Sequence, residues 1–284
     1  MSVLSVAPAP RGRLVEIADG RRLHVRFAGP LGATPLVVLE AGAFGFSADW
    51  ETVQAGLAVA GLRSMAYDRG GLGFSDPAPP PRDAAAIAAD LEHLLRVLGE
   101  NGPFIYCGHS MAGLHAPLFA SRHAGRMLGF VLVDASRPEA TQSPSLARAV
   151  GAFALLCRAA ATGAWLGLLR PLAVLGLGNA IGVEGPADVE KRWAFADARH
   201  NHGAALEVEA WIPSAQQALG VGAFGDDMPV MAILAGRQGP TSRMGLKDGN
   251  VIEVEGATHA SLLGPRHADV IVSSVARVRD AARA

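Results

Sequence analysis

The sequence predicts a doubly wound α/β fold, in which helices cover both faces of a mostly parallel, eight-stranded sheet. Short, continuously apolar runs alternate along most of the chain with amphipathic segments of helical period. This pattern is typical of parallel strands that are buried on both faces. A chain of 284 residues is long enough for one such domain with an insertion, and no linker rich in Pro, Gly or Ser divides it.

The chain is expected to open with a β-hairpin, because residues 13–17 and 22–27 form short alternating runs on either side of Ala18-Asp19-Gly20. The remaining elements follow in alternation. Strands are expected at residues 35–39, 63–67, 104–107, 130–133, 230–234 and 251–254, and helices at residues 50–60, 83–98, 111–123 and 268–281.

The alternation fails between residues 138 and 227, where the sequence becomes helical and rich in Ala and Leu. We therefore expect a core domain formed by residues 1–137 and 228–284, interrupted by a helical cap or lid at 138–227. The apolar excess gathers between residues 149 and 181, but charged residues and Pro171 leave no uncharged run of about 20 residues, the length of a membrane span. Buried or interfacial helices are favoured, and a cap that touches lipid weakly is the alternative.

The composition narrows the class of partner. A net charge of −1 gives no electrostatic reason to expect nucleic acid. Cys107 and Cys157 stand far apart and are expected to be buried without a disulfide. No metal-ligand cluster or nucleotide fingerprint occurs, so we expect no metal and no cofactor. The start of the chain lacks a secretory signal, which makes a cytoplasmic location the default expectation; the oligomeric state is left open.

The most informative segment is Gly108-His109-Ser110-Met111-Ala112-Gly113, which lies between an expected strand and an expected helix. A serine in such a strand-to-helix turn is a candidate nucleophile, and small neighbours are required because the backbone bends sharply there. The common form of this motif is G-x-S-x-G, and Ala112 stands where the second glycine is usual. A serine that caps the helix is the alternative interpretation.

Two further polar residues follow apolar strands. Asp134 comes after the sixth expected strand, and His259 comes after the eighth. Functional loops of parallel sheets lie beyond the carboxyl ends of the strands. The chain order Ser, Asp, His at these ends predicts a nucleophile, an acid and a base at one edge of the sheet. Asp134 could instead cap the next segment, and His259 could be a buried structural histidine.

With these residues the chain resembles the α/β-hydrolase superfamily, whose fold would cover nearly all of it except the cap. Residues 108–113 resemble the nucleophile elbow, and residues 67–76 resemble the family's D-R-x-G-x-G-x-S loop. Residues 39–43 stand at the oxyanion loop, with Ala41 in place of the usual histidine, and residues 256–259 resemble the segment of the catalytic histidine. The resemblance implies that the backbone N–H groups of Met111 and Ala43 form the oxyanion hole.

The acid has two candidates. Most members of the superfamily carry it after the seventh strand, where residues 234–240 offer no carboxylate. A minority carry it after the sixth strand, which fits Asp134, and Asp248 is the alternative. A dyad without an acid is a further possibility.

The other polar and aromatic residues of these motifs have structural expectations. We expect Asp68 and Arg69 to fix the loop beneath the site through a salt bridge or backbone hydrogen bonds. His109 is expected to pack and hydrogen-bond within the elbow. Surface positions are expected for His115, His123, His200 and His202, and Phe44, Phe46 and Trp50 could line the acyl pocket or belong to the core.

These motifs predict a serine hydrolase of a carboxylic ester with an apolar acyl or alcohol part, which would bind a small molecule. The expected cap supplies apolar side chains for such a pocket, although they could also simply pack the cap onto the sheet: Phe153, Leu155, Leu156, Trp165, Leu166, Leu168 and Leu169. Hydrolysis of a C–C, thioester or amide bond is the alternative within enzymes. The alternative outside enzymes is a non-catalytic member of the fold that binds a small ligand. A serine at the elbow argues against dehalogenases and epoxide hydrolases, which would carry a carboxylate there.

Overall fold

A computed structural model describes residues 7–222, 224, 228–236 and 248–283. The strands are β1 (Arg13–Glu16), β2 (Arg22–Ala28), β3 (Leu36–Glu40), β4 (Arg63–Tyr67), β5 (Phe104–His109), β6 (Met127–Val133), β7 (Val230–Ala235) and β8 (Val251–Val254). They form one sheet in the order β1-β2-β4-β3-β5-β6-β7-β8. β2 pairs antiparallel with β1 and β4, and the other pairs are parallel. The predicted fold class and its opening hairpin are confirmed.

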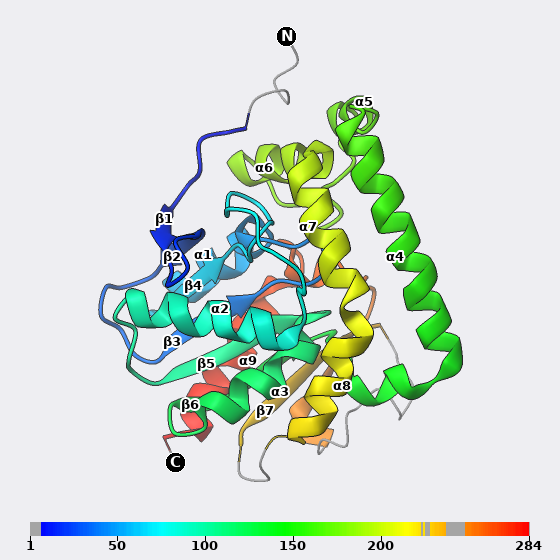
Figure 1. Cartoon of the computed structure of the whole chain (residues 1–284). Coiled ribbons are helices and arrows are strands. Elements are labelled where there is room, and N and C mark those ends of the chain that lie inside the picture. The colour runs from blue at the N-terminus through cyan, green and yellow to red at the C-terminus, as the bar shows by residue number, and fades with distance from the viewer. Residues whose placement is uncertain (1–6, 223, 225–227, 237–247, 284) are drawn as a thin grey trace.

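Helices cover both faces of this sheet (Figure 1). Helices α1 (Glu51–Val59) and α9 (Ala268–Ala281) pack on one face, and α2 (Ala84–Val97) and α3 (Ala112–His123) pack on the other. Neighbouring residues of a strand point to opposite faces, so a strand covered on both sides must be apolar throughout. In β3, for example, Val37 belongs to the core on the side of α1, and Val38 to the core on the side of α2.

The segment between β6 and β7 is helical, as the sequence indicates. It contains α4 (Pro144–Trp165), α5 (Arg170–Val174), α6 (Pro186–Ala196), α7 (Ala198–Glu209) and α8 (Trp211–Val221). Helix α8 packs against α2 and α3, α6 adds Trp193 to the core near α1, and α4 packs along α7 at the outer edge of the molecule (Figure 1). The division of the chain into a core domain and a cap stays a prediction.

Helix α4 differs from the other helices in composition and exposure. Among the described residues it is the helix that is long and apolar enough to cross a membrane, with a mean hydropathy of 1.3 over its most apolar window. Only 11% of that window is buried inside the molecule. Length and composition of a single helix are weak evidence of a span, but they leave a large apolar face in contact with solvent.

Candidate active site

Ser110 occupies the sharp turn between β5 and α3. Its backbone has a φ of 55°, a left-handed conformation that non-glycine residues seldom adopt. Small residues make the turn possible: a Cβ on Gly113 would lie 2.3 Å from the carbonyl oxygen of Ser136, and one on Gly42 would lie 2.7 Å from the Cβ of Ser110. The strained backbone thus presents the Ser110 hydroxyl at the end of the strand.

The registers of the parallel strands bring the three predicted site residues together. His109 at the end of β5 pairs with Val133 at the end of β6, and β7 and β8 end beside them. As a result the loops that follow β5, β6 and β8 meet at one edge of the sheet. Ser110, Asp134 and His259 lie in these three loops.

A continuous chain of hydrogen bonds joins these side chains. The imidazole Nδ1 of His259 lies 2.6 Å from Oδ2 of Asp134, and its Nε2 lies 2.9 Å from Oγ of Ser110. Because the Asp134 carboxylate accepts, Nδ1 carries the proton, and the lone pair of Nε2 faces the Ser110 hydroxyl. Ser110 is 8% exposed, whereas the His259 side chain is 53% exposed, so the imidazole stands at a site that is open to solvent.

Asp134 is held by a second contact. Its Oδ1 accepts a hydrogen bond of 3.2 Å from the backbone N–H of Ala235, at the end of β7. Its own backbone is also left-handed, with a φ of 43°. Asp134, the acid expected after the sixth strand, is therefore the carboxylate that contacts His259. The alternative, Asp248, begins the short 3₁₀ turn Asp248–Asn250 before β8.

His109 supports the same histidine from below. Its Nε2 donates a 3.1 Å hydrogen bond to the carbonyl oxygen of His259, and the two imidazole rings lie 4.5 Å apart. Burial, together with the nearby His259, lowers the pKa of His109 to about 3. His109 is thus a neutral donor that packs against the elbow, which matches its expected role.

The two backbone groups expected at the oxyanion hole lie close together. Met111 precedes the first turn of α3, and its buried side chain forms a small cluster with Leu114 and Ala215, against which Ala43 packs. Within the described part of the chain, neither Met111 nor Ala43 donates its backbone N–H to another residue. Both N–H groups are therefore available to an oxygen bound next to Ser110.

Arg69 fixes the loop that carries Ala43. Its guanidinium donates to the carbonyl oxygens of Ala41 and Gly42 at 2.5 and 2.8 Å, and it also binds the carboxylates of Glu40 and Glu207. Burial disfavours the charge of Arg69, but Glu207 and Glu40 outweigh burial and raise its pKa. This is the anchoring role expected for Arg69.

Asp68 fixes the neighbouring loop. Its carboxylate accepts hydrogen bonds from the backbone N–H groups of Ser47 and Phe74 and from Nδ1 of His24, at 2.8 to 3.0 Å. Burial opposes the charge of Asp68, yet these donors lower its pKa. The carboxylate therefore remains ionised and holds the loop, as expected.

The sequence analysis was wrong about two histidines. His115 is buried, with its Nδ1 3.5 Å from Oε1 of Glu40. His200 is also buried, and it accepts a hydrogen bond from the backbone N–H of Gly73 while its Nε2 donates to the carbonyl oxygen of Phe44. A carboxylate at the end of a buried strand, Glu40, was a signal for the first position. Nothing local marked the second, because its partners lie more than a hundred residues away.

A cavity of about 330 Å³ opens next to the oxyanion loop, beginning at Phe44. Its walls are mainly apolar and come from the oxyanion loop and from the segment between β6 and β7: Phe44, Phe46, Phe153, Leu156, Leu169 and Phe195. Lys191, His200 and Asn201 supply its polar atoms. Phe44 and Phe46 thus line a pocket, whereas Trp50 is buried in the core.

The cysteines and the remaining apolar side chains of α4 divide as follows. Cys107 and Cys157 are both buried and unpaired, and burial raises the pKa of the Cys157 thiol to about 11. Cys157 lines the cavity together with Phe153 and Leu156, whereas Leu155 and Trp165 are exposed. The expected apolar residues therefore contribute partly to the pocket and partly to the outer surface.

Comparison with known proteins identifies the family. A family model described as the alpha/beta hydrolase fold matches residues 35–240. The chain therefore belongs to the α/β-hydrolase family.

Curated relatives match shorter stretches. An AB hydrolase superfamily protein of Gibberella zeae is 34% identical over 112 residues, which are 38% of this chain and 34% of that protein. A probable transporter, efuK, of Hormonema carpetanum is 36% identical over 128 residues, which are 43% of this chain and 18% of that protein. The match therefore spans about a third or less of the length of these relatives.

Solved structures are similar over almost the whole chain. An enol-lactonase from Burkholderia xenovorans superposes with a TM-score of 0.66 at 20% identity, covering 94% of this chain and 100% of the other. An esterase from Thermogutta terrifontis gives 0.68 at 20% identity, covering 94% and 99%. A putative epoxide hydrolase from Pseudomonas aeruginosa gives 0.71 at 19% identity, covering 98% and 100%. At these identities the likeness establishes the fold alone.

Proposed function

We propose that this protein is a serine hydrolase that cleaves a carboxylic ester with an apolar acyl or alcohol part. The observation that carries the proposal is the hydrogen-bond chain from Ser110 through His259 to Asp134. Alone, a serine hydroxyl is a weak nucleophile, and an adjacent base must take its proton as the attack begins. Nε2 of His259 is within reach of that proton.

The proposed reaction begins when Oγ of Ser110 attacks the ester carbonyl carbon and His259 takes the hydroxyl proton. Asp134 stabilises the resulting imidazolium and keeps the ring oriented. The N–H groups of Met111 and Ala43 stabilise the negative charge on the carbonyl oxygen, and the former lies at the positive end of α3. The tetrahedral intermediate then expels the alcohol, which receives the proton from His259, and leaves an acyl group on Ser110.

Water completes the cycle. His259 takes a proton from the water, its oxygen attacks the acyl carbon, and a second tetrahedral intermediate releases the acid and returns the proton to Ser110. The exposed position of His259 gives water access to this step. The apolar cavity beside Ala43 and Phe44 is the proposed site for the apolar part of the substrate.

The nearest alternatives differ in the bond that is cleaved. Thioester, amide and C–C bond hydrolysis can use the same residues, so the site chemistry alone does not separate them. Ser110 in place of a carboxylate argues against epoxide opening by a carboxylate nucleophile. Non-catalytic ligand binding would not require an aligned Ser, His and Asp set.

The test is labelling with a fluorophosphonate, which reacts with activated serines, followed by peptide mass spectrometry. We expect one adduct on Ser110, none in Ser110→Ala, and an unchanged adduct in Ser121→Ala, which replaces an exposed serine on α3. Hydrolysis of p-nitrophenyl esters of increasing acyl length should then improve until the chain fills the cavity. A folded protein that is not labelled would contradict the proposal and favour a ligand-binding role.

A further inference from the structure

The outer side of α4 and the turns around α5 form an exposed apolar surface. We define the α4–α5 surface by six side chains, each between 56% and 77% exposed: Leu155, Leu156, Trp165, Leu166, Leu168 and Leu175. Elsewhere, Leu31 and Val59 are exposed as well, but as single residues on other elements. Scattered exposed apolar residues are normal, whereas a cluster of this kind usually marks an interaction site.

The fold does not need these side chains for packing. Helix α4 rests on the rest of the molecule through one face, on which Val150, Cys157 and Ala164 recur every seven residues and are buried. The opposite face carries Leu155 and Leu156, and Figure 1 shows α4 at the outer edge of the molecule. The apolar character of the outer face is therefore not explained by the core.

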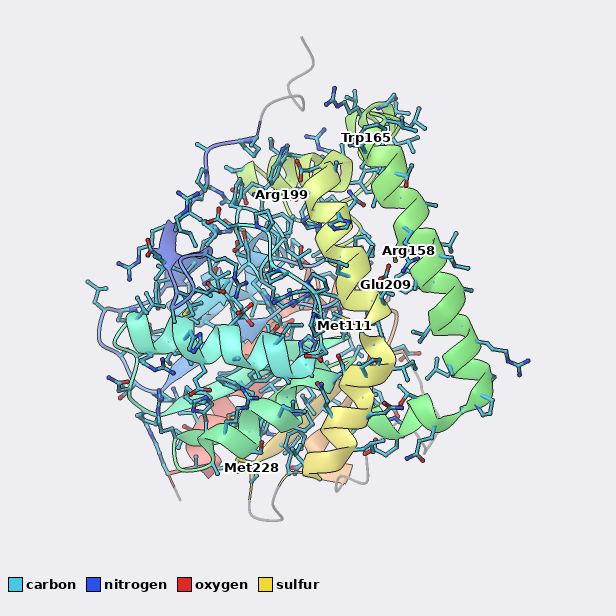
Figure 2. All side chains as sticks on the ribbon, in the orientation of Figure 1. Met111, Arg158, Trp165, Arg199, Glu209 and Met228 are labelled. Carbon is cyan, nitrogen blue, oxygen red and sulfur yellow. The ribbon has the colours of Figure 1, made fainter. Side chains whose placement is uncertain are left out.

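The charges around this surface are all positive. Between Glu139 and Glu184 the sequence contains no Asp or Glu and three arginines, Arg148, Arg158 and Arg170. Arg158 pairs with Glu209 of α7, and Figure 2 shows these two side chains facing each other. Within the described residues, no ion pair is formed by Arg148 or Arg170. The surface is thus apolar with free cationic groups at its two ends.

We infer that the α4–α5 surface docks on a lipid bilayer that carries anionic lipids. Apolar side chains and a tryptophan enter the boundary between headgroups and acyl chains, and arginines bind the anionic headgroups. Trp165 lies at the end of α4, beside α5, where it can reach this boundary (Figure 2). The segment combines all three features.

Two other occupants fit less well. A second copy of the chain would bring further arginines to the same face, and the segment 140–183 holds no carboxylate to receive them. A transmembrane position of α4 would separate it from α7, against which its buried face packs and to which Arg158 binds. Docking on the membrane surface keeps both contacts.

The cavity gives this surface a role in substrate supply. Phe153 and Leu156 line the cavity and are also exposed on α4, so the apolar wall of the cavity continues into the α4–α5 surface. An apolar ester dissolved in the bilayer could pass into the cavity with little contact with water. This second step rests on the proposed function, whereas docking itself does not.

The test measures docking separately from catalysis. Ser110→Ala protein is sedimented with vesicles of phosphatidylcholine alone or mixed with phosphatidylglycerol. We expect binding to the mixed vesicles that salt weakens. The double variant Leu168→Glu/Leu175→Glu should bind at least about tenfold more weakly, and Leu31→Glu, a control at an isolated exposed leucine, should bind like the parent.

Tryptophan fluorescence gives an independent readout. Trp165 is the one exposed tryptophan of four, since Trp50 and Trp193 are buried and Trp211 is partly buried. Mixed vesicles should shift the emission to shorter wavelength in the parent protein and leave it unchanged in Trp165→Phe.

Three results would overturn the inference. They are no binding to either kind of vesicle, binding that the double variant retains, and a stable dimer that Leu175→Glu converts to a monomer. The last result would assign the surface to a contact between copies. Because fluorophosphonate labelling is measured on the unmodified protein, failure of docking and failure of the proposed catalysis are distinguishable.

Discussion

The guanidinium of Arg69 and the carboxylate of Glu207 form a fully buried, two-pronged ion pair, with N–O distances of 2.8 and 2.7 Å. Arg69 follows β4, and Glu207 belongs to α7, 138 residues further along the chain. The same guanidinium holds the carbonyl oxygens of Ala41 and Gly42. One side chain therefore connects the oxyanion loop to the helical segment that covers it.

We predict that Glu207→Gln lowers the free energy of unfolding by about 3 kcal/mol, because removing one charge of a buried pair leaves its partner poorly compensated. Urea unfolding of the purified variant measures this loss. The control is Glu209→Gln on the same helix, whose partner Arg158 lies at the surface; it should change stability little, since exposed pairs are screened by water. Equal effects of the two variants would refute the structural role of the buried pair.

Gly42→Ala is predicted to damage catalysis directly. Its new Cβ would lie 2.7 Å from the Cβ of Ser110 and 3.1 Å from Nδ1 of His109, so the nucleophile must move. Displacement of a reacting group by about 1 Å can cost roughly a hundredfold in rate, and we expect a loss of kcat/KM of that order in an ester assay. Gly125→Ala is the control because a Cβ there meets open space. Normal kinetics in Gly42→Ala would contradict the close approach of the two loops.

Asp134→Asn is predicted to lower kcat by about 10⁴-fold, the effect of losing the correct imidazole tautomer. The asparagine amide would donate to Nδ1 of His259, so the ring proton would move to Nε2 and face Ser110. The carbonyl oxygen of asparagine can still accept from Ala235, which should preserve the fold. Stopped-flow or steady-state ester hydrolysis measures the loss, and Asp248→Asn should leave kcat unchanged. The reverse outcome would identify Asp248 as the acid.

The fold could be predicted from the sequence because its information is local. Each strand is a continuous apolar run, and each core helix has an apolar face, so the burial of Val37 and Val38 on opposite sides of the sheet follows from strand geometry. The positions of Ser110, Asp134 and His259 were predictable for a related reason. Each directly follows a strand, and parallel strands end at a common edge.

The buried polar network could not be predicted, because its contacts join distant segments. Glu207 and His200 lie on a helix whose sequence gives no sign of the residues that it meets. Their partners Arg69 and Gly73 belong to the loop after β4. A helical pattern shows which face of α7 is buried, but the identity of the opposing element depends on tertiary packing.

His200 provides a prediction about pH. Its Nδ1 accepts from Gly73, so the buried ring is neutral, and burial together with the nearby Lys191 lowers its pKa to about 3. The unfolded chain takes up a proton at His200 near the ordinary pKa of about 6.5. Between these two values the unfolded state binds more protons than the native state. The stability from neutral His200 is therefore fully present above pH ~6.5 and is lost as the pH falls toward 3.

We predict that the unfolding free energy falls by about 1 kcal/mol between pH 6 and pH 5 through this residue alone. His200→Gln removes the titrating group, so its stability should depend less steeply on pH by that amount, even if the variant is less stable at pH 7. His202→Gln, an exposed neighbour on the same helix, should keep the slope of the parent. Urea unfolding at a series of pH values gives all three slopes. An unchanged slope in His200→Gln would mean that the native protein takes up this proton without unfolding.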